Sequence, residues 1–179
     1  CRNLVRIPTK CLTVCAIPDL NEARLIKHTP ALALREKDEF MAYDDGNIFA
    51  KILRGEAPAF SVYEDDYSLA FMDVMPQVPG HTLVIPKDPT EDIFHADPMI
   101  LGQTMATVQK VGEAVKKAFE VPGIMIAQLN GQAAGQTVFH LHFHLLPRSQ
   151  GIELQMHARE MADFGELENH AARIKAALV

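Results

Sequence analysis

The sequence predicts an α+β fold, in which a single antiparallel sheet of about five strands has helices packed on it. Short strand-like runs in the first half are joined by turns, and strands joined in this way pair antiparallel. Longer segments carry apolar residues at helical spacing. The chain has 179 residues, of which 48% are hydrophobic, and this is enough for one domain with a substantial core.

The first elements of the predicted domain are a short helix and three strands. Residues 46–55 (GNIFAKILRG) predict a helix that ends at Gly55, because glycine often follows the last helical turn. Residues 61–65 and 68–74 predict a hairpin through an acidic turn. Residues 81–87 predict a third strand after a loop that is rich in proline and glycine.

The second half predicts two longer helices and two further strands. Asp97 is expected to cap a helix with Pro98 at its first position, where the missing N–H of proline costs nothing. Residues 124–130 predict a buried strand. A C-terminal helix is indicated by an apolar stripe made of Leu167, Ala171, Ile174 and Leu178. The order helix, three strands, helix, two strands, helix is typical of an α+β domain.

Residues 1–40 fit poorly with the rest of the chain, and we expect the functional domain, with its C-terminal helix, to span residues 41–179. Three prolines interrupt any long element in the first stretch, and Met41 directly precedes the first predicted helix. We therefore expect residues 1–40 to be an N-terminal extension that is disordered, or a misplaced start. Whether Cys11 and Cys15 bind a metal is left open by their spacing.

Composition argues against several classes of function. The formal net charge is −6, so the chain lacks the basic face of a protein that holds nucleic acid by neutralising its phosphates. No apolar run approaches ~18 residues, so we expect no membrane span. All three cysteines precede residue 16, which argues against a secreted domain held by disulfides. We expect a cytoplasmic protein without nucleic-acid or membrane partners.

The stretch FHLHFHLLPR, residues 139–148, has histidines at alternate positions, His140, His142 and His144. Alternate residues of a strand share a face, so the pattern predicts three imidazoles on one face and core residues on the other. Their backbone span of about 13 Å is too long for all three to bind one zinc ion. Hydrogen-bonded structural histidines and a metal site stay open as alternatives. Catalysis explains the pattern better, because a neutral imidazole is a nucleophile near neutral pH.

The loop before the histidines offers groups that suit a phosphate. Gly135, Gln136 and Thr137 provide backbone N–H groups, a side-chain amide and a hydroxyl. The chain has neither a P-loop motif nor the GxGxxG motif of dinucleotide-binding proteins. The sequence therefore predicts phosphate chemistry that uses neither of these loops.

Together these segments resemble the histidine-triad (HIT) family, and its Hint-like branch in particular. GQTVFHLHFHLLPR is similar to the family motif of three histidines alternating with apolar residues, while FMDVMPQVPGHTLVIPK and NIFAKILRGEAPAFSVYEDD resemble its upstream segments. The resemblance covers about residues 45–150 in the family's order, and the C-terminal helix is similar to that of bacterial members. It implies the HIT-like fold and a homodimer whose two sheets join edge to edge.

The resemblance implies a nucleotidyl hydrolase or transferase that acts at the α-phosphate of purine nucleotides. His142 would be the nucleophile and would form a covalent nucleotidyl-histidine that water then cleaves, without a cofactor or a metal. His140 would fix the ring of His142, and His144 would bind phosphate oxygens. His81 matches the family's fourth histidine, behind the triad.

The resemblance also implies the substrate-binding residues. The phosphate site would be formed by Asn130, Gln136, Thr137 and Val138, with Thr137 near the leaving atom. Asp73 matches the carboxylate that accepts from the ribose hydroxyls, although a turn-capping role would explain it equally well. The apolar slot for the base would consist of Phe49, Ile52, Phe71 and Val74, which by composition alone are typical core residues.

The activity implied most directly is that of a purine nucleoside phosphoramidase, which hydrolyses a P–N bond to give AMP or GMP. The first alternative is a hydrolase of dinucleoside polyphosphates such as Ap4A. The second is a nucleotide-binding regulatory or scaffold protein. The leaving group, and the choice between adenine and guanine, stay open at this level.

Overall fold

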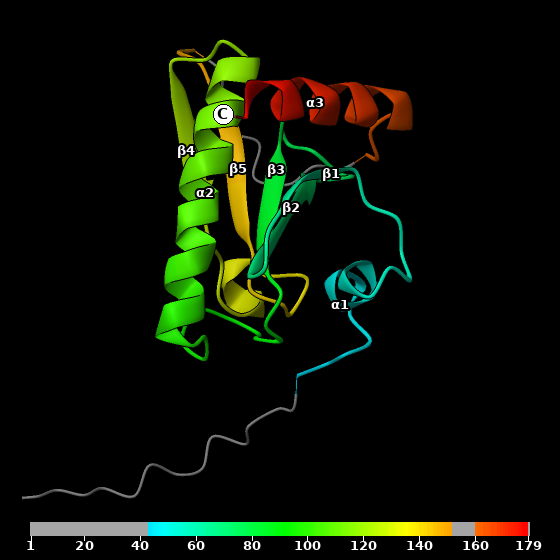
Figure 1. The fold of residues 1–179 in the computed structure, drawn as a ribbon, viewed down its shortest axis with the longest axis vertical. Helices are drawn as coiled ribbons and strands as arrows, with labels where there is room; N and C mark the ends of the chain where they lie inside the picture. Colours follow the sequence, from blue (N-terminus) through cyan, green and yellow to red (C-terminus); the bar gives the residue numbers. More distant parts are fainter. Residues whose placement is uncertain (1–42, 152–159, 179) are drawn as a thin grey trace, which may run out of the picture. The chain divides into compact units, whose positions relative to one another are not determined.

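The structure is a computed structural model that describes residues 43–151 and 160–178. In chain order, the elements are α1 (Ile48–Leu53), β1 (Ser61–Glu64), β2 (Ser68–Met72), β3 (Thr82–Pro86), α2 (Pro98–Ala118), β4 (Gly123–Ala127), the 3-10 helix η1 (Gln132–Ala134), β5 (Phe143–Arg148) and α3 (Phe164–Ala177) (Figure 1). This is the predicted order, with the 3-10 helix added. The prediction for residues 1–40 lies outside the described residues.

The five strands form one antiparallel sheet in the order β1-β2-β3-β5-β4. The predicted α+β fold is therefore confirmed. The contact between β3 and β5 joins segments far apart in sequence, with Leu83 opposite His144. This pairing brings the start of β3 beside the last histidine of the triad.

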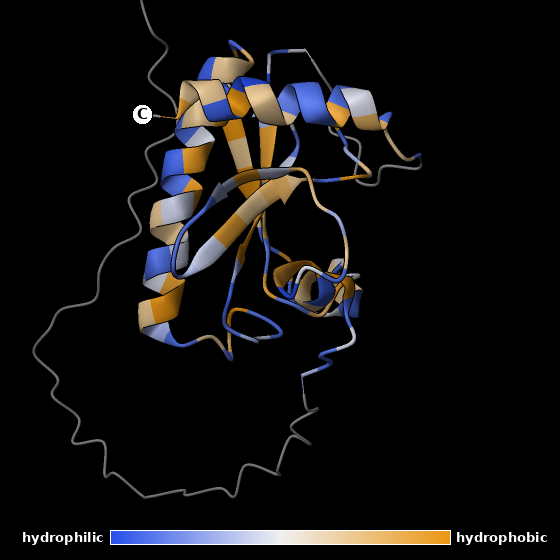
Figure 2. Cartoon of the chain, turned by 45° about the vertical axis from the view of Figure 1, so that its right-hand side comes forward, coloured by the Kyte–Doolittle hydropathy of each residue, from blue (hydrophilic) through white to orange (hydrophobic). Residues whose placement is uncertain are grey.

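Side chains alternate between the two faces of each strand, and helices pack against both faces of the sheet. One face packs against α2 and α3, and its core includes Ala70, Met72, Val84, Leu141, Phe143 and Leu145. The other face packs against α1, and its core consists of Phe49, Leu69, Phe71, Leu83 and Ile85. In Figure 2 the central strands are mainly hydrophobic, whereas the long helices carry both hydrophobic and hydrophilic residues. The central strands β2, β3 and β5 are thus largely buried on both sides, and the long helices are amphipathic.

The long helices begin and pack as their local sequence predicts. The Asp97 side chain accepts hydrogen bonds from the first free N–H groups of α2, and Pro98 occupies the first position. In α3, Leu167, Ala171 and Ile174 of the predicted stripe are buried, whereas Leu178 follows the helix as its C-cap and is half-buried. No helix within the described ranges is long and apolar enough to cross a lipid bilayer.

The strand predicted to contain the whole triad is shorter than expected, since β5 begins only at Phe143. The prediction was wrong here because the preceding backbone groups bond outside the sheet ladder. The Leu141 N–H donates to the Thr90 carbonyl at 2.8 Å, and the His140 carbonyl accepts from the His142 ring at 2.6 Å. These loop contacts replace strand pairing at the first two histidines.

The predicted alternation nevertheless holds across the triad. Leu141 and Phe143 are buried in the core under α2 and α3. His142 and His144 lie on the opposite side, where Phe49 of α1 packs edge-on against the His142 ring. The three histidines therefore face α1, although only the last belongs to the strand.

Candidate active site

The triad is built into a buried layer between the sheet and α1. The ring centroids of Phe49 and His142 lie 5.2 Å apart, and those of His142 and His144 lie 4.9 Å apart. His140 has no exposed surface, and His142 is 4% exposed. Because burial penalises the charged imidazolium, such a site favours neutral imidazoles.

The middle histidine has one nitrogen engaged and one available for chemistry. The Nδ1 atom of His142 lies 2.6 Å from the carbonyl oxygen of His140. A carbonyl can only accept, so we assign the ring proton to Nδ1 and the lone pair to Nε2. Burial lowers the pKa of His142, although the bond to the His140 carbonyl acts in the opposite direction. His142 is therefore neutral at pH 7, and Nε2 has the lone pair that a nucleophile needs.

His140 is held at both ring nitrogens. Its Nε2 donates to the Pro86 carbonyl at 2.9 Å, and its Nδ1 is hydrogen-bonded to the hydroxyl of Tyr43. Burial lowers the pKa of His140 to about 4, with a smaller contribution from His142, so the ring is neutral. This geometry agrees with a positioning role in which the His140 carbonyl orients His142.

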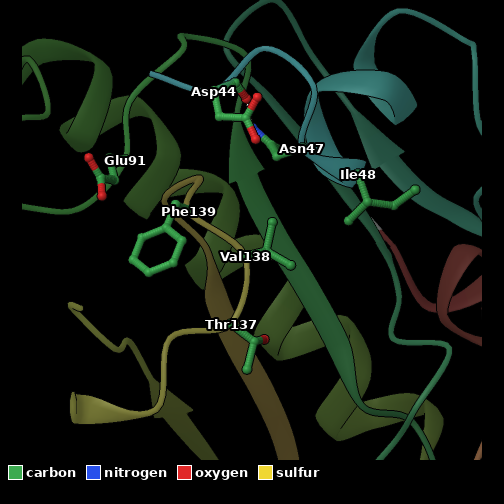
Figure 3. A pocket seen from close by; sticks show the side chains of 7 residues that line it. All are labelled: Asp44, Asn47, Ile48, Glu91, Thr137, Val138 and Phe139. Carbon is green, nitrogen blue, oxygen red and sulfur yellow. The ribbon is translucent and has the colours of Figure 1, made fainter. Parts of the chain in front are cut away.

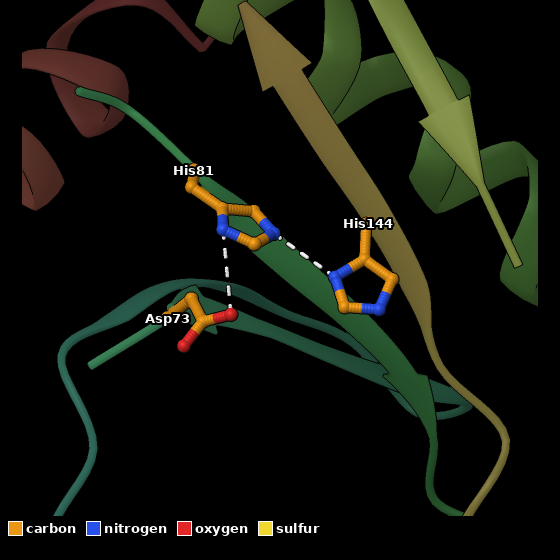
Figure 4. A group of neighbouring side chains, drawn as sticks. All are labelled: Asp73, His81 and His144. Carbon is orange, nitrogen blue, oxygen red and sulfur yellow. Dashed lines mark hydrogen bonds and ion pairs between the residues drawn. The ribbon is translucent and has the colours of Figure 1, made fainter. Parts of the chain in front are cut away.

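Behind His144 lies a chain of hydrogen-bonding groups from three different segments (Figure 4). The Nε2 atom of His81 is 2.9 Å from Nδ1 of His144, and the Oδ2 atom of Asp73 is 3.3 Å from Nδ1 of His81. His81 is 1% exposed. The predicted fourth histidine therefore lies between the carboxylate and the triad.

The proton positions in this chain follow from a backbone contact. The peptide N–H of Gln77 lies 3.2 Å from Nδ1 of His81, and a peptide N–H is always a donor. We therefore assign the His81 proton to Nε2, which donates to His144, and the His144 proton to its own Nε2. Burial lowers the pKa of His81 to about 3 and that of His144 to about 4. His144 is thus a neutral hydrogen-bond donor.

Asp73 makes the turn-capping contact considered from the sequence. Its Oδ1 accepts from the Met75 N–H at 2.8 Å, which is a turn-capping contact. Its Oδ2 faces His81, and burial raises the pKa of Asp73 to about 6. One oxygen therefore shapes the turn after β2, while the other stays close to the triad.

Asp73, His81 and His144 also form a group whose ligand atoms lie within 4.8 Å of one another, close enough to consider a metal ion. However, the two nitrogens of the His81 ring face different partners, the carboxylate on one side and His144 on the other. The contacts of the described residues here are a hydrogen bond between His81 and His144 and a carboxylate close to His81.

Two residues predicted for the phosphate site use their side chains to shape the loop. Gln136 is 1% exposed; its Oε1 accepts from the Gly131 N–H at 2.7 Å and its Nε2 donates to the Glu91 carbonyl at 2.8 Å. Asn130 accepts from the Ile93 N–H at 3.1 Å. Their amides hold the loop in place, and Thr137 lines the pocket beside it.

The remaining predicted residues divide between core and surface. Phe49 and Phe71 are buried with ring centroids 5.5 Å apart, and Ile52 and Val138 pack against the same cluster. Val74 is 40% exposed and lies outside that cluster. The structure thus gathers three of the four predicted base-slot residues, and two of these three are also core residues.

A pocket of about 480 Å³ opens beside the loop that contains Thr137. It is lined by Asp44, Asn47, Ile48, Glu91, Thr137, Val138 and Phe139 (Figure 3). Two of these residues carry carboxylates, and none of the described residues that line the pocket is basic. The volume is typical of a small-molecule site.

Sequence reasoning did not find Tyr43, Asp44 or Glu91. All three lie outside helices and strands, where no periodicity or motif marks a residue as functional. Their positions become informative only when the fold brings residues 43–48 beside residues 137–140. An acidic pair in loops would otherwise be regarded as solvated surface.

Comparison with known proteins gives the same family as the motifs. The HIT domain family matches residues 54–151. The chain is 42% identical over 101 residues to protein hit of Bacillus subtilis, a match that covers 56% of this chain and 70% of that protein. It is 36% identical over 103 residues to adenylylsulfatase HINT3 of Arabidopsis thaliana, covering 58% of this chain and 52% of that protein.

Among solved structures, the fold is similar to a Hit-like protein from Bartonella henselae that is described as involved in cell-cycle regulation. The TM-score is 0.72 and the sequence identity is 51%, and the match covers 76% of this chain and 100% of that one. The region that matches the HIT domain family, residues 54–151, contains β1 to β5 and the whole triad. The chain therefore belongs to the HIT family.

Proposed function

We propose that this protein is a purine nucleoside phosphoramidase, which hydrolyses the P–N bond at the α-phosphate of a nucleoside phosphoramidate to give AMP or GMP. The observation that carries the proposal is the state of His142. Its ring is buried and neutral, and its Nδ1–H is directed to a carbonyl at 2.6 Å, which leaves the Nε2 lone pair free. The likeness to adenylylsulfatase HINT3 supports chemistry at an adenylyl phosphate.

In the first step, Nε2 of His142 bonds to the α-phosphorus as the bond to the leaving amine breaks. The ring keeps its Nδ1 proton and becomes cationic, and the His140 carbonyl stabilises that charge. The amine leaves with the bonding electron pair and takes a proton that comes from solvent through the Thr137 hydroxyl. The Nε2–H of His144 donates to a non-bridging phosphate oxygen and stabilises the developing negative charge.

In the second step, water attacks the phosphorus and the bond to His142 breaks. The bonding pair returns to Nε2, one proton of the water passes to solvent, and the nucleoside monophosphate is released. Asp73 accepts from the ribose hydroxyls through its oxygen near the triad. Phe49, Ile52 and Phe71 form the apolar wall for the base, with Val74 at its exposed rim.

The pocket beside Thr137 favours an amine as the leaving group. Its described lining contains Asp44 and Glu91, and no lysine or arginine. A recess lined by charge of one sign repels ligands of the same sign, so sulfate and polyphosphate are disfavoured there. An amine that gains a proton as it leaves is attracted instead. This charge favours P–N cleavage over the alternative of an Ap4A-type hydrolase.

The test is a substrate panel that varies only the leaving group. Adenosine 5′-phosphoramidates should be cleaved with a kcat/KM at least about 100-fold above that for Ap4A or adenylyl sulfate. Asp44→Asn combined with Glu91→Gln should raise the rates with these two anionic compounds about tenfold, because each partly exposed charge contributes about 0.5–1 kcal/mol. Steady-state kinetics at fixed ionic strength measures both effects.

Glu113→Gln is the matched control, because it removes an exposed carboxylate from α2 and leaves the pocket unchanged. It should not alter the substrate ranking. A wild-type enzyme that prefers Ap4A would support the dinucleoside polyphosphate alternative. Tight AMP binding without turnover of any compound would support a nucleotide-binding regulatory or scaffold protein.

We also propose that the protein is a homodimer that pairs through β4. This strand lies at one edge of the sheet, and no other strand of the described residues covers its outer side. Ile126 of β4 is 51% exposed, and Met105 of the neighbouring α2 is 40% exposed. An unpaired edge with exposed apolar side chains is a site where a second copy would bury surface.

Ile126→Asp should therefore raise the dimer dissociation constant about 100-fold or more, because a symmetric interface places two charges in one buried contact. Sedimentation velocity over a range of concentrations measures this change. Tyr67→Asp, at the β1–β2 turn near the opposite edge of the sheet, is the control and should leave the assembly unchanged. A wild-type protein that is monomeric at high micromolar concentration would refute the proposal.

A further inference from the structure

Tyr43 precedes α1 and is separated by 97 residues from His140, yet its hydroxyl is hydrogen-bonded to Nδ1 of that histidine. The two rings meet edge to face with their centroids 5.5 Å apart. Phe49 packs edge-on against the same imidazole at 6.2 Å. The segment that leads into α1 thus reaches the first histidine of the triad.

The direction of this hydrogen bond follows from the other side of the ring. The Pro86 carbonyl can only accept, so Nε2 of His140 carries the proton and Nδ1 carries a lone pair. The Tyr43 hydroxyl must then donate to Nδ1. Burial raises the pKa of Tyr43, so its hydroxyl keeps the proton that it donates.

Bulk water does not replace this donor. His140 has no exposed surface, so bulk water does not reach Nδ1. A buried acceptor without a donor is unfavourable, and the ring would relieve it by rotating or by moving its proton. Either change would break the bond from Nε2 to the Pro86 carbonyl.

We propose that Tyr43 is a positioning residue that orients the nucleophile through His140. With both ring nitrogens bonded, the His140 side chain cannot rotate, and this fixes the peptide carbonyl that accepts from Nδ1–H of His142 at 2.6 Å. The direction of the Nε2 lone pair of His142 therefore depends on a hydroxyl that does not touch the substrate. The inference rests on the proposed function, in which His142 attacks phosphorus.

Tyr43→Phe removes the hydroxyl and keeps the ring. We expect kcat for an adenosine 5′-phosphoramidate to fall about tenfold, because one buried hydrogen bond is lost, with KM within about twofold of wild type. Tyr43 is not among the residues that line the pocket beside Thr137, which is why KM should change little. Tyr67→Phe, which removes a hydroxyl from an exposed tyrosine outside the site, should change neither constant.

A double-mutant cycle tests whether the effect passes through His140. In a His140→Phe background the ring has no nitrogen and the partner of the hydroxyl is gone, so Tyr43→Phe should lower kcat no further. An additive effect of the two substitutions would overturn the proposal. So would a Tyr43→Phe variant with the kcat of wild type, or one that loses only substrate affinity.

Nitrogen-15 NMR of the histidine rings provides a readout that needs no turnover. In wild type, His140 should show a protonated, slowly exchanging Nε2 and an unprotonated Nδ1 that accepts a hydrogen bond. Tyr43→Phe should shift the Nδ1 resonance and speed the exchange of the Nε2 proton, while Tyr67→Phe does neither. Unchanged His140 resonances would refute the role of Tyr43. If the resonances respond as expected and the wild type cleaves no phosphoramidate, the proposed reaction fails instead.

Discussion

Replacing His142 with asparagine is expected to lower turnover by about 10⁴-fold or more, because the variant has no nitrogen that can bond to phosphorus. The amide of asparagine can still donate to the His140 carbonyl, which accepts from His142 at 2.6 Å in the wild type. The loop and its neighbours should therefore keep their arrangement. Affinity for AMP should stay within a few-fold of wild type.

The covalent intermediate is the direct measurement of this role. Wild-type protein mixed with an adenosine 5′-phosphoramidate and quenched in alkali, which preserves a phosphorus–histidine bond, should show a transient gain of one AMP by intact-mass spectrometry. His142→Asn should show none. Peptide mapping of the wild-type adduct should locate the added mass on residue 142.

His95→Asn is the control, because this histidine lies on an exposed loop outside the triad. It should form the adduct at the wild-type rate. An adduct that persists in His142→Asn would assign the nucleophile to another residue. Turnover in the wild type without any adduct at the shortest times would favour direct attack by water.

The second large effect expected is a loss of stability in mild acid. Burial lowers the pKa of His81 to about 3 and those of His140 and His144 to about 4, from 6.5 in the unfolded chain. Below pH 6.5 the unfolded state therefore binds protons that the folded state excludes. Stability is fully present above pH 6.5 and is lost as the pH falls toward 4.

The magnitude follows from the same shifts. Between pH 8 and pH 5, each of these histidines should lower the free energy of unfolding by about 2 kcal/mol. Asp73 acts in the opposite direction, because its pKa is raised from 3.8 in the unfolded chain to about 6 in the folded state. Between these two pH values the folded state binds a proton that the unfolded state does not, and this stabilises the fold. The net loss should be on the order of 4 kcal/mol, a large share of the stability of an ordinary domain.

Urea unfolding at pH 8 and at pH 5, at one ionic strength, measures this difference. His144→Asn should reduce the loss of stability by about 2 kcal/mol. Asparagine does not titrate, so the unfolded state of the variant binds one proton fewer at pH 5. Tyr67→Phe should leave the pH dependence as it is in the wild type. Equal stability at the two pH values would mean that the triad is not held neutral, and would weaken the assignment of a neutral nucleophile.

Much of the fold could be predicted from local sequence. The start of α2 at Asp97 and Pro98 depends on side chains that bond to their own first turn, so neighbouring residues are sufficient to specify it. The buried stripe of α3 and the alternation across the triad likewise depend on the period of one element. The motif of three histidines then pointed to the family that the comparisons confirm.

The tertiary structure decided how the histidines are connected. Hydrogen bonds to Thr90 and Pro86 end the expected strand early and fix the ring of His140. The amides of Asn130 and Gln136, predicted to contact phosphate, bond to distant backbone groups and hold the loop instead. No local pattern encodes these partners, because each joins segments that only the folded chain brings together.

The sequence by itself therefore determined the elements, their faces and the residue types available for chemistry. The structure determined the proton positions, which depend on whether each ring nitrogen meets a donor or an acceptor. Tyr43, Asp44 and Glu91 show the difference most clearly, since each lies in a loop and gains its place at the site from contacts across the fold. Periodicity reports which side of an element is buried, whereas the reactivity of an imidazole depends on the few atoms that surround it.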